Sequence, residues 1–408
     1  MTSVFKDIEL GPPIEVFLRS KDFQDDSHES KVNLTIGAYR TAEGKPWVLP
    51  VVRKVESTLA QDESQNHEYL PVLGLESFSQ AATTMILGED SVAIKEGRAI
   101  GVQTLSGTGA LRVAAEFLAR NLHFNTFYYS KPTWENHRLI FLNGGFKNNF
   151  EYRYWNPDSR GIDLNGMIED LRNAPVNAVI ILHTCAHNPT GCDPTHAQWD
   201  KIADVIEEKH LFPIFDTAYQ GFASGDLDYD AYAVRLFASR NIEFICTQSF
   251  AKNFGLYNER VGNLVLITNN TSKIPEIKSQ LTLIIRGMYS NPPKHGAKIV
   301  SVVLNDNNLY TQWKDHIHTM SGRIKEMRTG LYDRLMKLET PGTWQHIINQ
   351  IGMFSYTGLS ENQVQYLIKN YHIYLLRSGR INMCGLNEQN LDYVAKAIND
   401  AVTKWPSS

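Results

Sequence analysis

The sequence predicts an α/β fold, in which helices sandwich a mostly parallel sheet and a smaller α/β domain adjoins it. Short apolar runs, typical of strands buried on both faces, alternate with amphipathic helical segments in the middle of the chain. Strand, helix and strand in succession imply right-handed crossovers and a parallel sheet. The pattern changes at about residue 309, where a long, charged helical stretch leads to residue 338 and then to short mixed elements. This change indicates the second domain.

The first strand and helix enclose a turn that is suited to an anion. Residues 100–105 are strand-like and run directly into Ser106-Gly107-Thr108-Gly109, which opens a helix with apolar periodicity. Free N–H groups and the positive end of the helix dipole favour an anion there, and the hydroxyls add donors. The spacing matches neither the P-loop nor G-x-G-x-x-G. A tight turn with a helix cap therefore remains an alternative to phosphate binding.

Further strands and one well-marked helix follow in the middle of the chain. Residues 178–182 form an apolar run, and His-Asn-Pro-Thr-Gly at 187–191 is a turn. Thr195 and Gln198 have the spacing of a capping box at the start of the next helix. The later strands are predicted at residues 212–216, 243–249 and 264–268.

Asp216 and Tyr219 are candidates for ligand binding. Asp216 ends a predicted buried strand, at the sheet edge where α/β proteins bind their ligands. A carboxylate there can accept a protonated ring nitrogen, and Tyr219 can offer its phenol to the same ligand. A helix N-cap is an equally good local interpretation of Asp216.

Lys252 is a candidate nucleophile. It follows a predicted strand and lies among apolar and aromatic neighbours, which can lower its pKa and favour Schiff-base chemistry. A surface lysine is the ordinary alternative. Ser249-x-x-Lys252 also has the form of a serine-hydrolase nucleophile motif, with Tyr289-Ser290-Asn291 and Arg328-Thr329-Gly330 as loose partner motifs. Those enzymes work outside the cytoplasm, and we expect this chain to remain inside it.

Histidines and cysteines do not predict a metal site or a disulfide framework. His183 and His187 are four residues apart, but they lie beside an Asn-Pro turn rather than in a helix, and His137 is distant in sequence. The four cysteines are far too few for a disulfide-rich secreted chain. We therefore expect free thiols and no metal.

Composition excludes several classes of protein. The chain has 408 residues, 42% of them hydrophobic and 21% charged, which excludes a disordered or fibrous protein. Its 40 basic and 44 acidic residues give a net charge of −4, so no basic excess predicts a nucleic-acid partner. No apolar stretch approaches the roughly 18 residues that span a bilayer, and the N-terminus resembles neither a signal peptide nor a transit peptide. We expect a cytoplasmic protein with no membrane partner.

The order of these features resembles that of the aspartate aminotransferases, class I enzymes of fold type I that use pyridoxal 5′-phosphate. The segments that carry the resemblance are residues 32–40, 46–50, 67–71, 132–137, 187–191, 249–255, 257–263, 290–293 and 378–382. The resemblance covers nearly the whole chain, and Trp47 with residues 152–155 is similar to the animal cytosolic branch. It implies an N-terminal arm at 1–11, a small domain at 12–46 and 320–408, and a large cofactor-binding domain at 47–319.

The resemblance also implies how the cofactor is held. Lys252 would form a Schiff base with its aldehyde and shuttle the substrate proton, and Asp216, supported by His137, would pair with the ring nitrogen. Trp134 would stack on the ring, while Asn188 and Tyr219 would bind its phenolic oxygen. The residues that would hold the phosphate are Ser106, Gly107, Thr108, Ser249, Arg260 and, from a partner subunit, Tyr69.

Two arginines would select the substrate. By resemblance, Arg380 would bind the α-carboxylate, with Asn188 and Gly37 nearby, and Arg286 of a partner subunit would bind the side-chain carboxylate. The expected protein is a homodimer with shared active sites and dicarboxylic amino-acid and 2-oxo-acid substrates.

The resemblance implies transamination between L-aspartate and 2-oxoglutarate by a ping-pong mechanism. At Thr35 and Tyr289 the sequence departs from the residues that are common in the family. An enzyme of the same subgroup that prefers aromatic amino acids is therefore the nearest alternative. The serine hydrolase above and a non-enzymatic binding protein are the more distant ones.

Overall fold

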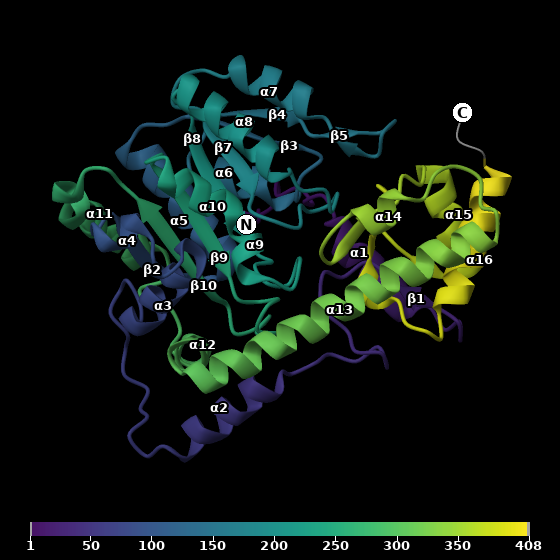
Figure 1. Cartoon of the computed structure of the whole chain (residues 1–408), viewed down its shortest axis with the longest axis horizontal. Helices are drawn as coiled ribbons and strands as arrows, with labels where there is room; N and C mark the ends of the chain where they lie inside the picture. The colour runs from purple at the N-terminus through teal and green to yellow at the C-terminus, as the bar shows by residue number, and fades with distance from the viewer. Residues whose placement is uncertain (1, 406–408) are drawn as a thin grey trace.

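A computed structural model of the chain, which describes residues 2–405, contains a seven-stranded mixed sheet (Figure 1). Its strands lie in the order β2-β10-β9-β8-β7-β3-β4. In that order their bounds are Ala99–Leu105, Val261–Ile267, Phe244–Ser249, Phe212–Thr217, Val179–His183, Thr126–Lys131 and Asn148–Arg153. The predicted strands at 100–105, 178–182, 212–216, 243–249 and 264–268 are thus confirmed to within a few residues.

Helices cover both faces of the sheet because its central strands are apolar on both sides. In β7, Val179 and Ile181 pack into one core and Ile180 and Leu182 into the other. The first core includes helices α5 (Ser106–Asn121), α6 (Asn136–Asn143) and α11 (Ile274–Met288). The second includes α4 (Val92–Lys95), α7 (Leu164–Arg172), α8 (His196–Glu208) and α10 (Tyr232–Ser239). The capping box that Thr195 and Gln198 predict is present at the start of α8.

Strand β10 is antiparallel to both of its neighbours, and here the expectation of strand–helix–strand succession is wrong. Residues 250–260 join β9 to β10 without a crossover helix, so the chain returns beside β9 in the opposite direction. Ser249 therefore faces Gly262, and Val261 faces Leu105. The reversal brings the start of β10 to the edge where β9 ends and α5 begins.

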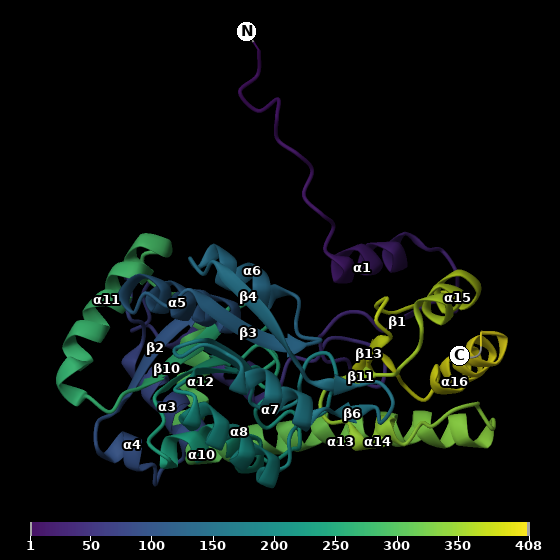
Figure 2. The same cartoon turned by 90° about the horizontal axis from the view of Figure 1, so that it is seen from above.

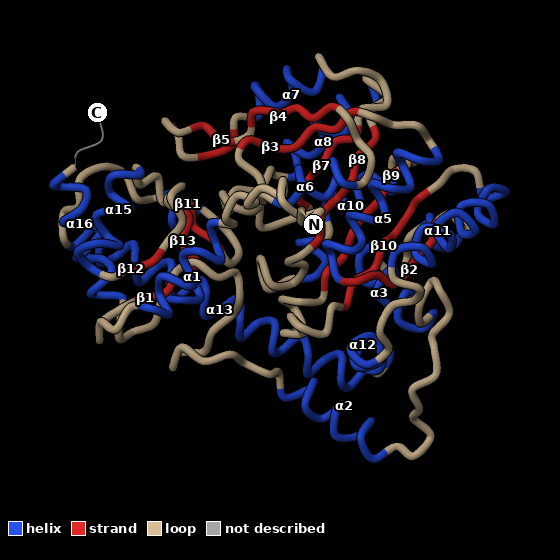
Figure 3. Tube along the Cα trace, turned by 180° about the vertical axis from the view of Figure 1, so that it is seen from behind, coloured by secondary structure: helices blue, strands red, loops and turns tan. Residues whose placement is uncertain are grey.

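A long helix, α13 (Asn307–Lys337), leads from this sheet to a second group of elements (Figures 1 and 3). That group holds α1 (Glu15–Asp25), α14 (His346–Asn349), α15 (Glu361–Tyr371), α16 (Leu391–Lys404) and the short strands β1 (Val32–Asn33), β11 (Phe354–Tyr356), β12 (Ile373–Tyr374) and β13 (Arg380–Asn382). Strand β1 pairs with β12, so segments from both ends of the chain meet there. The domain boundaries themselves stay a prediction.

The remaining elements lie beside α13 or between the larger ones. Helices α2 (Pro50–Gln61), α3 (Glu76–Leu87) and α12 (His295–Asn305) pack near the sheet end of α13. Helix α9 (Leu227–Asp230) follows β8, and β5 (Trp155–Asn156) pairs with β6 (Gly161–Ile162). Among the described residues, none of the helices is long and apolar enough to cross a membrane.

Residues 2–14, which precede α1, extend away from the rest of the described chain (Figure 2). Several of their apolar side chains are uncovered, and Leu10 is fully exposed. Exposed apolar side chains of this kind remain available for contact with another surface.

Candidate active site

A cavity of about 490 Å³ lies at the edge of the sheet where β7, β8 and β9 end and α5 begins. Strand ends at this edge position polar side chains while the sheet behind them stays apolar. The predicted site residues that line the cavity are Gly37, Ser106, Gly107, Thr108, Trp134, Asn188, Asp216, Tyr219, Ser249, Lys252, Arg260 and Arg380. Segments far apart in sequence thus converge on one site.

Asp216 lies within β8 and is held by His137 from α6. His137 Nε2 is 2.9 Å from Asp216 Oδ2, and its Nδ1 is 2.9 Å from Thr133 Oγ1. Burial raises the pKa of Asp216, but the hydrogen bond and charge of His137 outweigh it, so the pKa lies below its ordinary 3.8. The buried carboxylate is therefore ionised at neutral pH. Its position inside a strand excludes the N-cap interpretation.

Lys252 follows β9 in a turn and lies in the same cavity. Its Nζ is 4.9 Å from the centre of the Tyr219 ring. Burial lowers the pKa of Lys252, the charge of Asp216 opposes this, and Arg260 lowers the pKa further, to a value below 10.5. An amine of lowered pKa has a larger neutral fraction near pH 7, so it is more available as a nucleophile and proton acceptor than a surface lysine. Lys252 is only partly exposed and lines the cavity, so the surface alternative is wrong.

The start of α5 and the start of β10 form a polar corner of the cavity. Ser106 Oγ lies 2.9 Å from Ser249 Oγ, and the Ser106 N–H donates to the Arg260 carbonyl at 3.1 Å. Two glycines allow this approach: a Cβ on Gly262 would lie 2.4 Å from the Ser106 backbone, and one on Gly107 would lie 3.2 Å from Ser249 Cβ. The corner combines helix N–H groups, hydroxyls and a guanidinium, which together suit a phosphate.

Arg380 reaches the other side of the cavity from β13. Its guanidinium donates to Thr35 O at 2.6 Å and Asn188 Oδ1 at 3.3 Å, and it lies over the Phe354 ring at 4.2 Å. Burial lowers the pKa of Arg380 to about 10, so it stays charged at neutral pH. Its Nε is buried and has no protein partner in the described part of the chain. A side chain at Gly37 would collide with Phe354.

Three predicted residues do not line the cavity: His137 is fully buried behind Asp216, while Tyr69 and Arg286 lie outside. The Tyr69 side chain is 86% exposed, and Arg286 projects from the end of α11, where it donates to the Ser290 hydroxyl. Neither contributes to the cavity of its own chain.

The structure adds residues that the sequence reasoning did not assign to the site. Phe354 packs on Arg380, Tyr257 lines the cavity and accepts the Tyr39 N–H, and α1 contributes Glu15 to Phe17. Lone aromatic residues carry no local signal of such a role.

His183 also lines the cavity, beside the His137–Asp216 pair. Both of its ring nitrogens are buried without a protein partner among the described residues, and burial lowers its pKa to about 3. His137, His183 and Asp216 each place a potential ligand atom within 4.8 Å of the others. The sequence reasoning did not expect this grouping, which only the folded chain creates.

The serine-hydrolase hypothesis finds no support in the geometry. In the described chain, the Ser249 hydroxyl contacts Ser106 and the Ala251 N–H, rather than Lys252. Arg328, which that hypothesis placed in a partner motif, is buried in α13 and donates to the Ile347 and Gly352 carbonyls. The motif likenesses are therefore coincidental.

Comparisons with known proteins agree with this geometry. The family model for aminotransferase class I and II matches residues 29–398. A relative from Caenorhabditis elegans, named cytoplasmic aspartate aminotransferase, is 56% identical, and the match covers 98% of each chain. The solved aspartate aminotransferase from Saccharomyces cerevisiae cytoplasm is 47% identical, with a TM-score of 0.95 over 98% of this chain and 99% of that one.

A further similar structure is that of an enzyme solved with its cofactor attached. It is an aromatic-amino-acid aminotransferase from Burkholderia pseudomallei, covalently bound to pyridoxal phosphate. It is 38% identical, with a TM-score of 0.95 over 98% of this chain and all of that one. The family match spans most of the sequence and the relatives match it along nearly their full length, so the chain belongs to the aminotransferase class I and II family.

Proposed function

We propose that the chain is a cytoplasmic, pyridoxal-phosphate-dependent aspartate aminotransferase that converts L-aspartate and 2-oxoglutarate to oxaloacetate and L-glutamate. The observation that carries the proposal is the convergence of the buried Lys252 amine, the ionised Asp216 and the Arg380 guanidinium on one cavity. The relative from Caenorhabditis elegans supports both the activity and the compartment by its name.

The residues of the cavity fit pyridoxal 5′-phosphate. Ser106, Gly107, Thr108, Ser249 and Arg260 would hold its phosphate, in a corner that a Cβ on Gly107 would narrow. Asp216, with His137 behind it, would hold the protonated ring nitrogen, and Trp134, Asn188 and Tyr219 would contact the ring. When bound, the cofactor supplies an aldehyde that reacts with amines and an electron-accepting ring.

Lys252 and Arg380 would act directly on the substrate. The lowered pKa of Lys252 increases its neutral fraction, so Nζ could accept the proton of the substrate Cα and deliver it to the carbon of the cofactor's aldehyde group. Arg380 would bind the α-carboxylate with its guanidinium, which lines the cavity, and hold Cα near Nζ. The Tyr219 phenol, whose pKa burial raises, would remain a protonated hydrogen-bond donor in the same site.

A homodimer would complete the site. Arg286 and Tyr69 are exposed and lie outside the cavity of their own chain, which suits residues that serve the cavity of a partner. The extended apolar segment before α1 offers a further surface for that partner. Arg286 of the partner subunit would bind the side-chain carboxylate of the substrate, while the partner's Tyr69 would bind the phosphate.

Arg286→Asp is expected to lower kcat/KM for aspartate by at least about 100-fold, because a substrate carboxylate would lose its cation and meet a like charge. The kcat/KM for alanine should change far less. Lys278→Asp makes the same charge change at another exposed position of α11 and is the matched control. Equal losses for aspartate and alanine in Arg286→Asp would show that Arg286 does not recognise the side chain.

Steady-state kinetics with aspartate and phenylalanine test the choice of substrate. The alternative, an aminotransferase that prefers aromatic amino acids, is favoured by the likeness to the Burkholderia pseudomallei structure. We expect a higher kcat/KM for aspartate, together with a change in the visible absorption of the bound cofactor when aspartate is added. A higher value for phenylalanine would contradict the proposal, and a colourless protein without turnover would exclude both enzymes.

A further inference from the structure

Two residues with buried amide side chains directly follow Tyr219 and Lys252 in the sequence. Gln220 is the residue after Tyr219 and Asn253 the residue after Lys252, and they are 1% and 2% exposed. Asn253 Nδ2 donates to the Gln220 backbone carbonyl at 3.2 Å. This bond joins two segments of the chain one residue beyond the point where the Lys252 amine lies over the Tyr219 ring.

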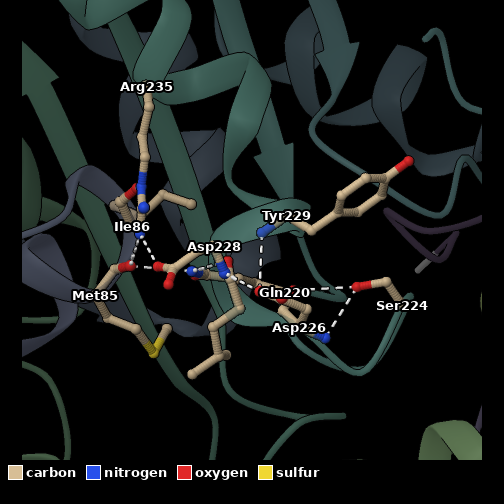
Figure 4. Close-up of polar contacts among 9 residues, drawn as sticks. Met85, Ile86, Gln220, Ser224, Asp226, Asp228, Tyr229 and Arg235 are labelled. Carbon is tan, nitrogen blue, oxygen red and sulfur yellow. Dashed lines mark hydrogen bonds and ion pairs between the residues drawn. The ribbon is translucent and has the colours of Figure 1, made fainter. Parts of the chain in front are cut away.

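The two residues joined by this hydrogen bond, Gln220 and Asn253, are each hydrogen-bonded to helices as well. Gln220 Nε2 donates to the carbonyls of Met85, in α3, and Leu227, in α9, at 3.0 and 3.2 Å (Figure 4). On the other side, the Asn253 carbonyl accepts a hydrogen bond from Trp313 Nε1, in α13, at 2.8 Å. Because these groups are buried, water cannot replace a lost partner at low cost.

Asp230 also holds the turn after Tyr219, through hydrogen bonds to its backbone. Its Oδ2 accepts the Gly221 N–H at 2.7 Å, and its carboxylate also accepts the Ser224 N–H. Gly221 has a φ of +79°, and a Cβ there would lie 2.5 Å from a Leu227 methyl group, so the turn has little room to change.

Arg235 fixes the segment that carries Asp230 against α3. It donates to the Ile86 carbonyl at 3.2 Å and pairs with Asp228 at 2.7 Å (Figure 4). The conformation after Tyr219 is therefore determined by several independent contacts. The segment after Lys252 is joined to this turn through the Asn253 side chain, while the Asn253 carbonyl and the Phe254 ring, stacked at 4.5 Å on Trp313, attach it to α13.

We propose that Asn253 and Gln220 are positioning residues that hold the Lys252 amine and the Tyr219 phenol in register for proton transfer. The proposal rests on the proposed function, since it takes Lys252 as the proton carrier and Tyr219 as a hydrogen-bond donor in the same site. Without the Asn253 donor, the segment of Lys252 loses its direct bond to the rigid turn. A displacement of about 1 Å in a reacting group can lower a rate by about 100-fold.

The test compares Asn253→Leu with Asn263→Leu in the full-length protein. Leucine removes the amide but keeps a similar volume, and Asn263 is an equally buried asparagine that bonds Thr83 and Gln248 instead of this turn. Two quantities are measured: kcat and KM for aspartate in the cofactor-loaded enzyme, and the pH midpoint of Lys252 labelling by trinitrobenzenesulfonate without added cofactor.

We expect Asn253→Leu to lower kcat by about 10- to 100-fold with little change in KM. The labelling midpoint should rise toward the ordinary lysine value, because a released Lys252 regains water and moves away from Arg260. Burial and Arg260 both lower its pKa, and their loss outweighs the loss of Asp216, which raises it. Asn263→Leu should leave both quantities near those of the unchanged protein. A normal kcat in Asn253→Leu, or equal effects in the two variants, would overturn the proposal.

A second variant covers the case in which Asn253→Leu does not fold. Gln220→Met removes the bonds to Met85 and Leu227, keeps the backbone acceptor and should shift kcat and the labelling midpoint in the same directions. An unchanged midpoint would overturn the proposal. If the unchanged protein does not turn over aspartate, the proposed function fails, but the labelling comparison still tests the two amides.

Discussion

Lys252→Ala is expected to reduce aspartate turnover by at least about 10⁴-fold, because the variant loses both the covalent anchor of the cofactor and the proton carrier of the reaction. Cofactor binding should remain measurable, since the phosphate corner at Ser106, Ser249 and Arg260 is unchanged. Borohydride reduction followed by mass spectrometry should find the cofactor on the Lys252 peptide of the unchanged protein and none on the variant.

Lys201→Ala is the control for this measurement, because Lys201 is exposed on α8, away from the cavity. It should keep normal turnover and a normal reduced adduct on Lys252. The assignment of Lys252 would be refuted by a reduced adduct in Lys252→Ala equal to that of the unchanged protein.

Asp216→Ala is expected to slow transamination by about 10³-fold, because the anion that keeps the ring nitrogen protonated is lost from a site shielded from water. The pKa of Asp216 lies below 3.8, so the carboxylate is ionised throughout the range in which the protein is assayed. The factor lost should therefore be the same at pH 6 and pH 8, which single-turnover rates with aspartate can measure.

Asp204→Ala removes an exposed carboxylate from α8, where Asp204 pairs with Arg240, and should leave the rate unchanged. Near-normal turnover in Asp216→Ala would show that this carboxylate does not support the ring. A loss that vanishes at pH 8 would point to a group other than Asp216.

Features that depend on neighbouring residues could be predicted from the sequence. The capping box of Thr195 and Gln198 and the apolar run in β7 are local patterns, and the structure contains both. The strand-to-helix turn at Ser106 is also local, and it lies at the predicted place.

Features that depend on long-range pairing could not be predicted in this way. The direction of β10 is decided by its neighbours β2 and β9, and only this reversal places Arg260 beside Ser106. His183 joins His137 and Asp216 because strand and helix ends meet at one edge of the sheet. The order of the family segments indicated which residues meet, while the folded chain is needed to say by which contacts.

Helix α13 connects the two ends of the site. Near its start, Trp313 donates to the Asn253 carbonyl beside Lys252, and further along Arg328 donates to the Gly352 carbonyl in the segment that leads to Phe354 and Arg380. About 22 Å of regular helix separates Trp313 from Arg328.

The length of the helix thus sets the distance between the segment of Lys252, whose amine would move the proton, and the segment that leads to Arg380, whose guanidinium would hold the carboxylate. One inserted residue between Trp313 and Arg328 would move these side chains apart by about 1.5 Å and rotate them by about 100° relative to each other. Both contacts could not then be kept at once. Chain length within α13 is therefore as tightly constrained as the identity of the residues in the cavity.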